Sequence, residues 1–276
     1  MSKSQVILNG KLEAEKIVKL LNGQIAKMKV KPGLAVILVG GNKASETYVK
    51  IKEKRADELG IYFEKYILSA SVSEKKILDL IQKLNKSKKI HGIFVQLPLP
   101  KKFDTQKIIQ SIKPKKDVDG FLLQKQKNKK TKKHIRIVPP TIAAVLHLIK
   151  ISNKKLTEEK AIILANSLEF AEPLKKELEK KKIKVSIKIK PKFIRLLDYQ
   201  IIIIALGKKH FLKPNMIKKD AIIIDVGITR QGGKIFGDVD PLCFKKSKYI
   251  SPVPGGVGPL TVAFLLKNLV KLAKII

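Results

Sequence analysis

The first quarter of the chain alternates between two hydrophobic patterns. Between Leu12 and Met28 the apolar residues recur at helical spacing, whereas Gly33–Val39 is a continuous apolar run that ends at two glycines. The first pattern predicts a helix and the second a buried strand. A helix at about 44–59, a strand at 62–68, a helix at 74–84 and a strand at 91–96 are expected next. This succession predicts βαβ units and a mainly parallel sheet.

A second series of the same kind follows a turn at 116–120 and a long helix at 142–151. Strands are expected at 161–164, 185–189, 200–205 and 221–226, with a helix at 173–181. The run 200–205 is apolar on both faces, which is typical of a central parallel strand. We therefore predict a two-domain α/β protein. Residues 1–138 plus 252–276 form one domain, and 139–251 form an inserted Rossmann-like domain.

Between the last predicted strands and a terminal helix at 262–275 lies a segment rich in proline and glycine, residues 252–259. Its three prolines and three glycines predict that residues 252–259 form neither a regular strand nor a regular helix. Thr261 is the expected cap of the helix that follows. The segment is either a stiff connector or a shaped wall of a cleft between two domains.

Composition narrows the possible functions. The chain has 59 basic and 23 acidic residues, a net charge of +36, which is compatible with nucleic-acid binding. However, the lysines are spread over nearly every predicted helix, aromatic residues make up only 5% and tryptophan is absent. Single-strand binders interleave basic and stacking side chains, so specific nucleic-acid binding is not expected. The densest basic segment, Lys125–His134, is predicted to be an exposed loop.

The chain carries one cysteine, Cys243, which excludes an internal disulfide framework and a cysteine-based metal cluster. No metal site is predicted. Neither a signal peptide nor an apolar run long enough for a transmembrane helix is evident, so we expect a cytoplasmic location.

Six segments, in this order, together resemble the bifunctional methylenetetrahydrofolate dehydrogenase/cyclohydrolase family. They are Ala44-Ser45-x-x-Tyr48-Val49-x-x-Lys52, 95–100 (VQLPLP), 116–120 (KDVDG), 224–228 (IDVGI), 237–240 (GDVD) and 252–259 (PVPGGVGP). The resemblance implies a folate-binding first domain, a dinucleotide-binding second domain and a homodimer. The implied chemistry belongs to one-carbon metabolism and purine biosynthesis. It comprises NADP-dependent oxidation of 5,10-methylenetetrahydrofolate to the 5,10-methenyl form and hydrolysis of that cation to 10-formyltetrahydrofolate.

The resemblance also implies roles for individual residues on the folate side. Tyr48 and Lys52 are four positions apart on one helix face. Lys52 corresponds to the catalytic lysine, and Tyr48 is expected to pack against the folate ring or to orient Lys52 for catalysis. Gln96 is expected to hydrogen-bond both Lys52 and the ligand. Asp119 is expected to accept the paired N–H groups of the aminopyrimidine ring, with Asp117 as a supporting catalytic group. Pro254, Gly255 and Gly256 would form a rim over the folate.

The cofactor side departs from the family pattern. The resemblance places cofactor contacts at Ala165, Asn166, Ser167 and Ile228, but the family usually reads Gly-x-Ser-x-x-x-Gly-x-Pro after the first Rossmann strand. Here both glycines are alanine, at 165 and 171, and two acids, Glu169 and Glu172, lie near the helix start where phosphate would bind. Three interpretations stay open: NADP (or NAD) binding by a repacked loop, a chain that acts only as a cyclohydrolase, and a basic nucleic-acid scaffold without folate chemistry.

Overall fold

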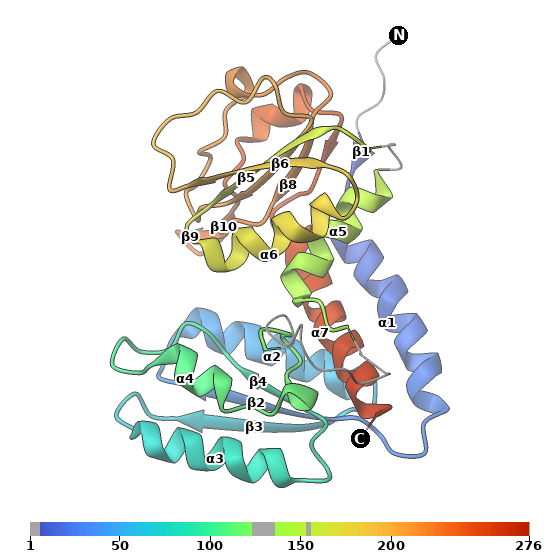
Figure 1. Ribbon diagram of the computed structural model, residues 1–276, viewed down its shortest axis with the longest axis vertical. Coiled ribbons are helices and arrows are strands. Elements are labelled where there is room, and N and C mark those ends of the chain that lie inside the picture. The colour runs from blue at the N-terminus through green and yellow to red at the C-terminus, as the bar shows by residue number, and fades with distance from the viewer. Residues whose placement is uncertain (1–5, 123–135, 153–155, 276) are drawn as a thin grey trace. The chain divides into compact units, whose positions relative to one another are not determined.

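The computed structural model describes residues 6–122, 136–152 and 156–275. The predicted loop Lys125–His134 lies outside these residues. The chain divides into two compact α/β units, one formed by Met1–Ala14 with Thr141–Thr261 and the other by Glu15–Pro140 with Val262–Ile276 (Figure 1). None of the helices described is long and apolar enough to cross a lipid bilayer.

The unit formed by Glu15–Pro140 with Val262–Ile276 contains a sheet of three parallel strands in the order β3-β2-β4. Its elements are β2 (Gly33–Val39), α2 (Lys43–Glu58), β3 (Tyr62–Leu68), α3 (Glu74–Lys86), β4 (Gly92–Val95), α4 (Thr105–Gln110) and a 3-10 turn at Pro114–Lys116. Ile77, Ile81 and Leu84 of α3 and Ile108 of α4 pack on one face of this sheet. The predicted parallel sheet is confirmed, and β2 and β3 have the predicted bounds.

The other unit contains six parallel strands in the order β1-β11-β8-β7-β5-β6. The strands are β1 (Val6–Ile7), β5 (Lys160–Ala165), β6 (Lys184–Ile189), β7 (Ile201–Ala205), β8 (Ile222–Asp225) and β11 (Tyr249–Ile250). Every residue from Ile201 to Ile204 is buried, as predicted for a central strand. The helix α6 (Leu168–Glu179) packs on β5 and β6.

Two of the short strands that were not predicted pair with each other. They are β9 (Thr229–Gln231) and β10 (Lys234–Phe236), which pair in antiparallel fashion. The two-residue turn between them is Gly232-Gly233, and both glycines have positive φ, 57° and 72°. Two glycines between short apolar runs are a recognised hairpin signal, because such turns need positive φ at both central positions.

The expected domain limits, 1–138 plus 252–276 and 139–251, differ from the observed division at both ends. The N-terminal segment groups with the larger sheet because β1 pairs with β11. Residues 252–261 also group with that sheet. The last helix, α7 (Val257–Ala273), therefore begins in one unit and continues in the other, as does α1 (Gly10–Ala26). The long helix α5 (Pro140–Ile151) begins two residues earlier than predicted.

Two helices begin five residues before their predicted starts. The helix α7 starts at Val257, so Val257, Gly258 and Pro259, the end of the proline- and glycine-rich segment, form its first turn. Pro259 is tolerated there because the first N–H groups of a helix have no intrahelical partner. Thr261 is inside the helix and does not cap it; its Oγ1 donates to the Val257 carbonyl at 3.1 Å. In α6, Ser167 takes the N-cap position and Pro173 lies within the helix.

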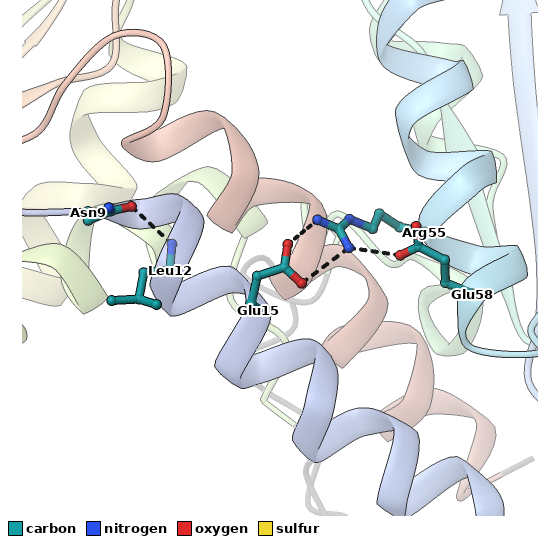
Figure 2. Close-up of polar contacts among 5 residues, drawn as sticks. All are labelled: Asn9, Leu12, Glu15, Arg55 and Glu58. Atoms are coloured by element: carbon teal, nitrogen blue, oxygen red, sulfur yellow. Dashed lines mark hydrogen bonds and ion pairs between the residues drawn. The ribbon is translucent and has the colours of Figure 1, made fainter.

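The helix α1 starts with a side-chain cap and continues to an ion pair with α2. The Asn9 Oδ1 accepts a hydrogen bond from the Leu12 N–H at 3.0 Å (Figure 2). Further along, the Arg55 guanidinium binds the Glu15 carboxylate through both terminal nitrogens, and its Nη1 lies 2.8 Å from Glu58 Oε2 (Figure 2).

We expect this ion pair to contribute little to stability. The Arg55 side chain is 28% exposed and that of Glu15 45%, so water and salt screen both charges. Arg55→Ala should lower the free energy of unfolding by only about 1 kcal/mol, and by less in 1 M salt. Urea unfolding at two salt concentrations measures this, with Lys50→Ala on the same helix as the control. A cost that is unchanged in high salt would contradict a screened ion pair.

Candidate active site

The side chain of Lys52 is buried in the three-stranded unit. It is only 6% exposed, although it projects from α2, whose neighbouring lysines Lys50 and Lys54 are exposed. Its Nζ lies 4.3 Å from the centre of the Phe94 ring and 5.9 Å from that of Tyr48. Asn42 sets the start of α2, because its Oδ1 accepts the Ser45 N–H at 3.1 Å. The predicted pairing of Tyr48 with Lys52 on one face of the helix is present.

Gln96 and Asp119 face the same ammonium group. Lys52 Nζ donates to Gln96 Oε1 at 2.8 Å, and the Gln96 amide nitrogen donates to the Leu97 carbonyl at 2.8 Å. Gln96 follows β4, and its N–H is held by the Ile37 carbonyl of the adjacent strand. The side chain is thus fixed at the carboxyl end of the sheet, where open α/β folds bind ligands.

Burial brings the pKa values of Lys52 and Asp119 close together. Desolvation lowers the pKa of Lys52 to about 8, and the charge of Asp119 opposes that shift. Desolvation, together with the charge of Asp117, raises the pKa of Asp119 to about 8, and Lys52 opposes it. The two groups therefore titrate as a coupled pair in the range where a proton donor or acceptor is useful near neutral pH.

Asp117 is occupied by its own turn. Its side chain is almost fully buried, and the Oδ1 accepts the N–H groups of Asp119 and Gly120 at 3.1 and 3.0 Å, while Oδ2 accepts that of Leu122 at 2.8 Å. Burial raises the pKa of Asp117, against the effect of these backbone donors. The carboxylate predicted as a catalytic group thus shapes the turn that presents Asp119.

Two further residues, which the sequence reasoning missed, hold this turn from outside. Lys116 is buried, and its Nζ donates to the carbonyls of Leu84 and Ser87 at 2.8 and 2.6 Å, at the end of α3. Asn268 of α7 donates to the carbonyls of Val118 and Val138 at 3.0 and 2.9 Å. A buried polar position in an otherwise apolar terminal helix is the signal that could have identified Asn268.

The cofactor residues predicted after β5 are found at a turn that needs no glycine. Ala165 is the last residue of β5 and Ala171 lies within α6, and neither has positive φ. Alanine in place of glycine therefore requires no left-handed backbone conformation at either position. Asn166 Nδ2 donates to the Leu206 carbonyl at 2.8 Å, which joins this turn to the end of β7. Ser167, the N-cap, makes no side-chain capping bond.

The two acids noted near the start of α6 differ in exposure, and Glu172 is half-buried within the helix. Glu169 is exposed in the first turn of α6, and a hydrogen bond from Ser167 lowers its pKa. It therefore remains ionised beside the positive end of the helix. Ile228, the other predicted cofactor residue, is 40% exposed after β8. These four residues, Ala165, Asn166, Ser167 and Ile228, all lie at the carboxyl edge of the six-stranded sheet.

The rim residues Pro254, Gly255 and Gly256 belong to the unit of the six-stranded sheet. The Gly255 carbonyl accepts the Lys11 N–H at 2.8 Å, and Gly255 has a φ of 107°, which disfavours other residues. A Cβ at Gly10 would lie 1.8 Å from the Gly256 carbonyl oxygen, so the start of α1 packs directly on this segment. Within the described residues, no cluster of three or more His, Cys, Asp or Glu side chains could hold a metal ion.

Comparison with known proteins identifies both units. Residues 8–119 match the family model "Tetrahydrofolate dehydrogenase/cyclohydrolase, catalytic domain", and residues 139–276 match "Tetrahydrofolate dehydrogenase/cyclohydrolase, NAD(P)-binding domain". The chain is 40% identical to the bifunctional protein FolD of Campylobacter hominis over 276 residues, covering 97% of each chain. It is 39% identical to that of Pelagibacter ubique over 277 residues, covering 98% of each.

Solved structures give the same result. The bifunctional enzyme FolD from Campylobacter jejuni aligns with a TM-score of 0.91 at 39% identity, covering 98% of this chain and 99% of that chain. FolD from Trypanosoma brucei, solved with NADP cofactor and an inhibitor, aligns with a TM-score of 0.90 at 30% identity, covering 98% and 97%. With matches of this extent over both units, the chain belongs to the tetrahydrofolate dehydrogenase/cyclohydrolase family.

Proposed function

We propose that this chain carries both activities of its family and that Lys52 is the catalytic group of the second. The activities are NADP-dependent oxidation of 5,10-methylenetetrahydrofolate and hydrolysis of the resulting 5,10-methenyl cation to 10-formyltetrahydrofolate. The observation that carries the proposal is the buried Lys52, with its Nζ 2.8 Å from Gln96 and its pKa lowered by burial. A solvated lysine would stay protonated at neutral pH and could not accept a proton from water.

The groups around Lys52 have distinct roles in this proposal. Lys52, in its neutral form, takes a proton from the water that adds to the methenyl carbon, and returns it to the ring nitrogen as the bond between that nitrogen and the carbon breaks. The remaining hydroxyl proton leaves to solvent as the formyl carbonyl forms. Gln96 orients Lys52 through its Oε1. Asp119 accepts the paired N–H groups of the pterin ring, a geometry that two carboxylate oxygens match. Tyr48 packs beside the folate ring, and Asp117 holds the turn that carries Asp119.

The turn after β5 is compatible with a bound dinucleotide. Neither alanine has positive φ, and Ser167 makes no capping bond to the first N–H groups of α6. The Glu169 N–H bonds its own carboxylate, so its neighbours in the first turn are the proposed phosphate donors. NADP, when bound, supplies the acceptor for the hydride of the methylene carbon. Asn166, Ser167 and Ile228 are proposed to position it. Glu169 keeps its charge near this helix end, and for this reason we expect weaker phosphate binding than with a neutral residue there.

One preparation assayed separately for the two reactions tests the proposal. NADPH formation from methylenetetrahydrofolate reports the dehydrogenase, and loss of methenyl absorbance reports the cyclohydrolase. Both are expected. Hydrolysis without any NADP or NAD binding at millimolar concentration would instead favour a chain that is only a cyclohydrolase, and salt-sensitive RNA binding without folate binding would favour a nucleic-acid scaffold. We also propose a cytoplasmic homodimer, which fractionation and a measurement of mass in solution would test.

The rate of hydrolysis should depend on a group with a pKa of about 8. Because the pKa of Lys52 is lowered to about 8, the neutral amine becomes the major form above that pH. We expect kcat/KM for hydrolysis, corrected for the uncatalysed reaction, to rise with pH and to level off above about 8. Lys52→Arg should lose this inflection, since arginine stays charged. A flat profile in the unmodified protein would contradict a neutral lysine base.

A further inference from the structure

Asp238 is a fully buried carboxylate that binds three consecutive backbone N–H groups. Its Oδ2 accepts those of Leu206 and Gly207 at 2.6 and 3.1 Å, and its Oδ1 accepts that of Lys208 at 2.6 Å. These residues follow β7, and Gly207 has a φ of 62°, which lets the three donors converge. Such a nest of N–H groups usually binds an anion. Here the chain's own carboxylate occupies it.

Leu206 and Gly207 connect this nest to the predicted cofactor residues. The Leu206 carbonyl accepts the hydrogen bond from Asn166, in the turn after β5. A Cβ built on Gly207 would lie 3.8 Å from the Ile228 carbonyl oxygen, so this loop runs beside the segment after β8. Asp238 therefore holds a loop that contacts two predicted cofactor residues, Asn166 and Ile228.

A second buried carboxylate, Asp225, extends the network. Its Oδ1 accepts the N–H groups of Gly227 and Asp238, both at 3.1 Å, and its Oδ2 accepts that of Val239 at 2.9 Å. Its own N–H donates to Ser251 Oγ at 2.8 Å, just after β11. The turns that follow β5, β7, β8 and β11 are thus joined through two carboxylates at one edge of the sheet.

Two glycines are required by this packing. A Cβ at Gly227 would lie 2.0 Å from the Asp238 carboxylate, and one at Gly237 would lie 2.0 Å from Asp225 Oδ2. The Asp238 carboxylate thus fills the space beside Gly227, two residues after Asp225. The Asp225 carboxylate fills the space beside Gly237, the residue before Asp238. A side chain at either glycine would displace a buried carboxylate. The two glycines and the two aspartates are therefore needed together for this packing of the turns.

We propose that Asp238 is a positioning residue for the dinucleotide, acting through the loop Leu206–Lys208 on Asn166 and Ile228. The inference rests on the proposed function, because it assumes that Asn166 and Ile228 contact NADP. An asparagine at 238 presents an NH2 group where one oxygen accepts N–H donors, so at least one donor is left unpaired and the loop shifts. Lys52, Gln96 and Asp119, the proposed groups of the hydrolysis site, belong to the other unit.

The test compares the two activities of Asp238→Asn with those of the unmodified protein. We expect the KM for NADP to rise by about tenfold or more, while the rate of methenyl hydrolysis stays within about twofold. Gly207→Ala gives a second variant that keeps the buried carboxylate. Its added methyl group meets only one atom, at 3.8 Å, so its effect comes from the positive φ, and its KM for NADP should also rise.

The matched control is Asp240→Asn, two residues further along. The Asp240 carboxylate binds Lys213 Nζ and the Leu242 N–H, and among the described residues none of its side-chain hydrogen bonds reaches Leu206, Gly207 or Lys208. Its KM for NADP should be unchanged. An unchanged KM in both Asp238→Asn and Gly207→Ala would overturn the inference, as would an equal loss of both activities. Absence of NADP reduction by the unmodified protein would instead refute the proposed dehydrogenase.

Discussion

Lys52→Ala is expected to lower the rate of methenyl hydrolysis by about 10²–10⁴-fold, the usual contribution of general acid–base catalysis. Hydride transfer from the methylene carbon needs no proton from Lys52, so NADPH formation should persist within about tenfold. The fold should persist too, because the substitution removes a charge whose burial is unfavourable, as the lowered pKa of Lys52 shows. Separate assays and a melting curve measure all three effects.

The control for this substitution is Lys54→Ala. Lys54 lies two residues away on α2 and is exposed, so removing it changes the net charge equally without touching Gln96. Both activities should be unchanged. A folded Lys52→Ala protein that hydrolyses the methenyl cation at the normal rate would exclude Lys52 as the proton carrier.

Local sequence patterns predicted those strands and helices whose ends are marked by turn residues such as glycine. Gly33–Val39 was predicted to the residue because it is an apolar run that ends at two glycines, and Tyr62–Leu68 because it follows the helix end at Gly60. The starts of α6 and α7 were predicted too late because a proline was taken to mark a helix boundary, whereas Pro259 lies in the first helical turn. The strand β1 has only two residues, and its partner β11 is about 240 residues away, so no local pattern could reveal it.

The site could be predicted only in part, and for a similar reason. Lys52 and Gln96 are 44 residues apart, and nothing in the local composition distinguishes Lys52 from its neighbours; the family resemblance singled it out. The same resemblance did not show that Asp117 is saturated by its own turn, or that Asp225 and Asp238 share a network. Those facts depend on where backbone N–H groups converge in the fold, which a linear pattern does not contain.

Asp119→Asn is expected to weaken both reactions together, by about 10²-fold in kcat/KM for the folate substrate. The amide would place an NH2 group against one of the N–H donors of the pterin ring, and it carries no charge to strengthen the remaining bond. The KM for NADP should not change. Because the Asp119 charge raises the pKa of Lys52, removing it should also move the inflection of the hydrolysis profile to lower pH.

This combination separates the proposed role of Asp119 from that of Lys52. A group that acts only by changing the pKa of Lys52 would affect hydrolysis and leave NADPH formation intact. A group that binds the pterin ring must affect both reactions, because both act on a folate bound through the same ring. Asp79→Asn is the matched control, because that carboxylate is exposed on α3 and pairs with Lys75. An Asp119→Asn protein with an unchanged KM for folate in both assays would show that the pterin ring is recognised by another group.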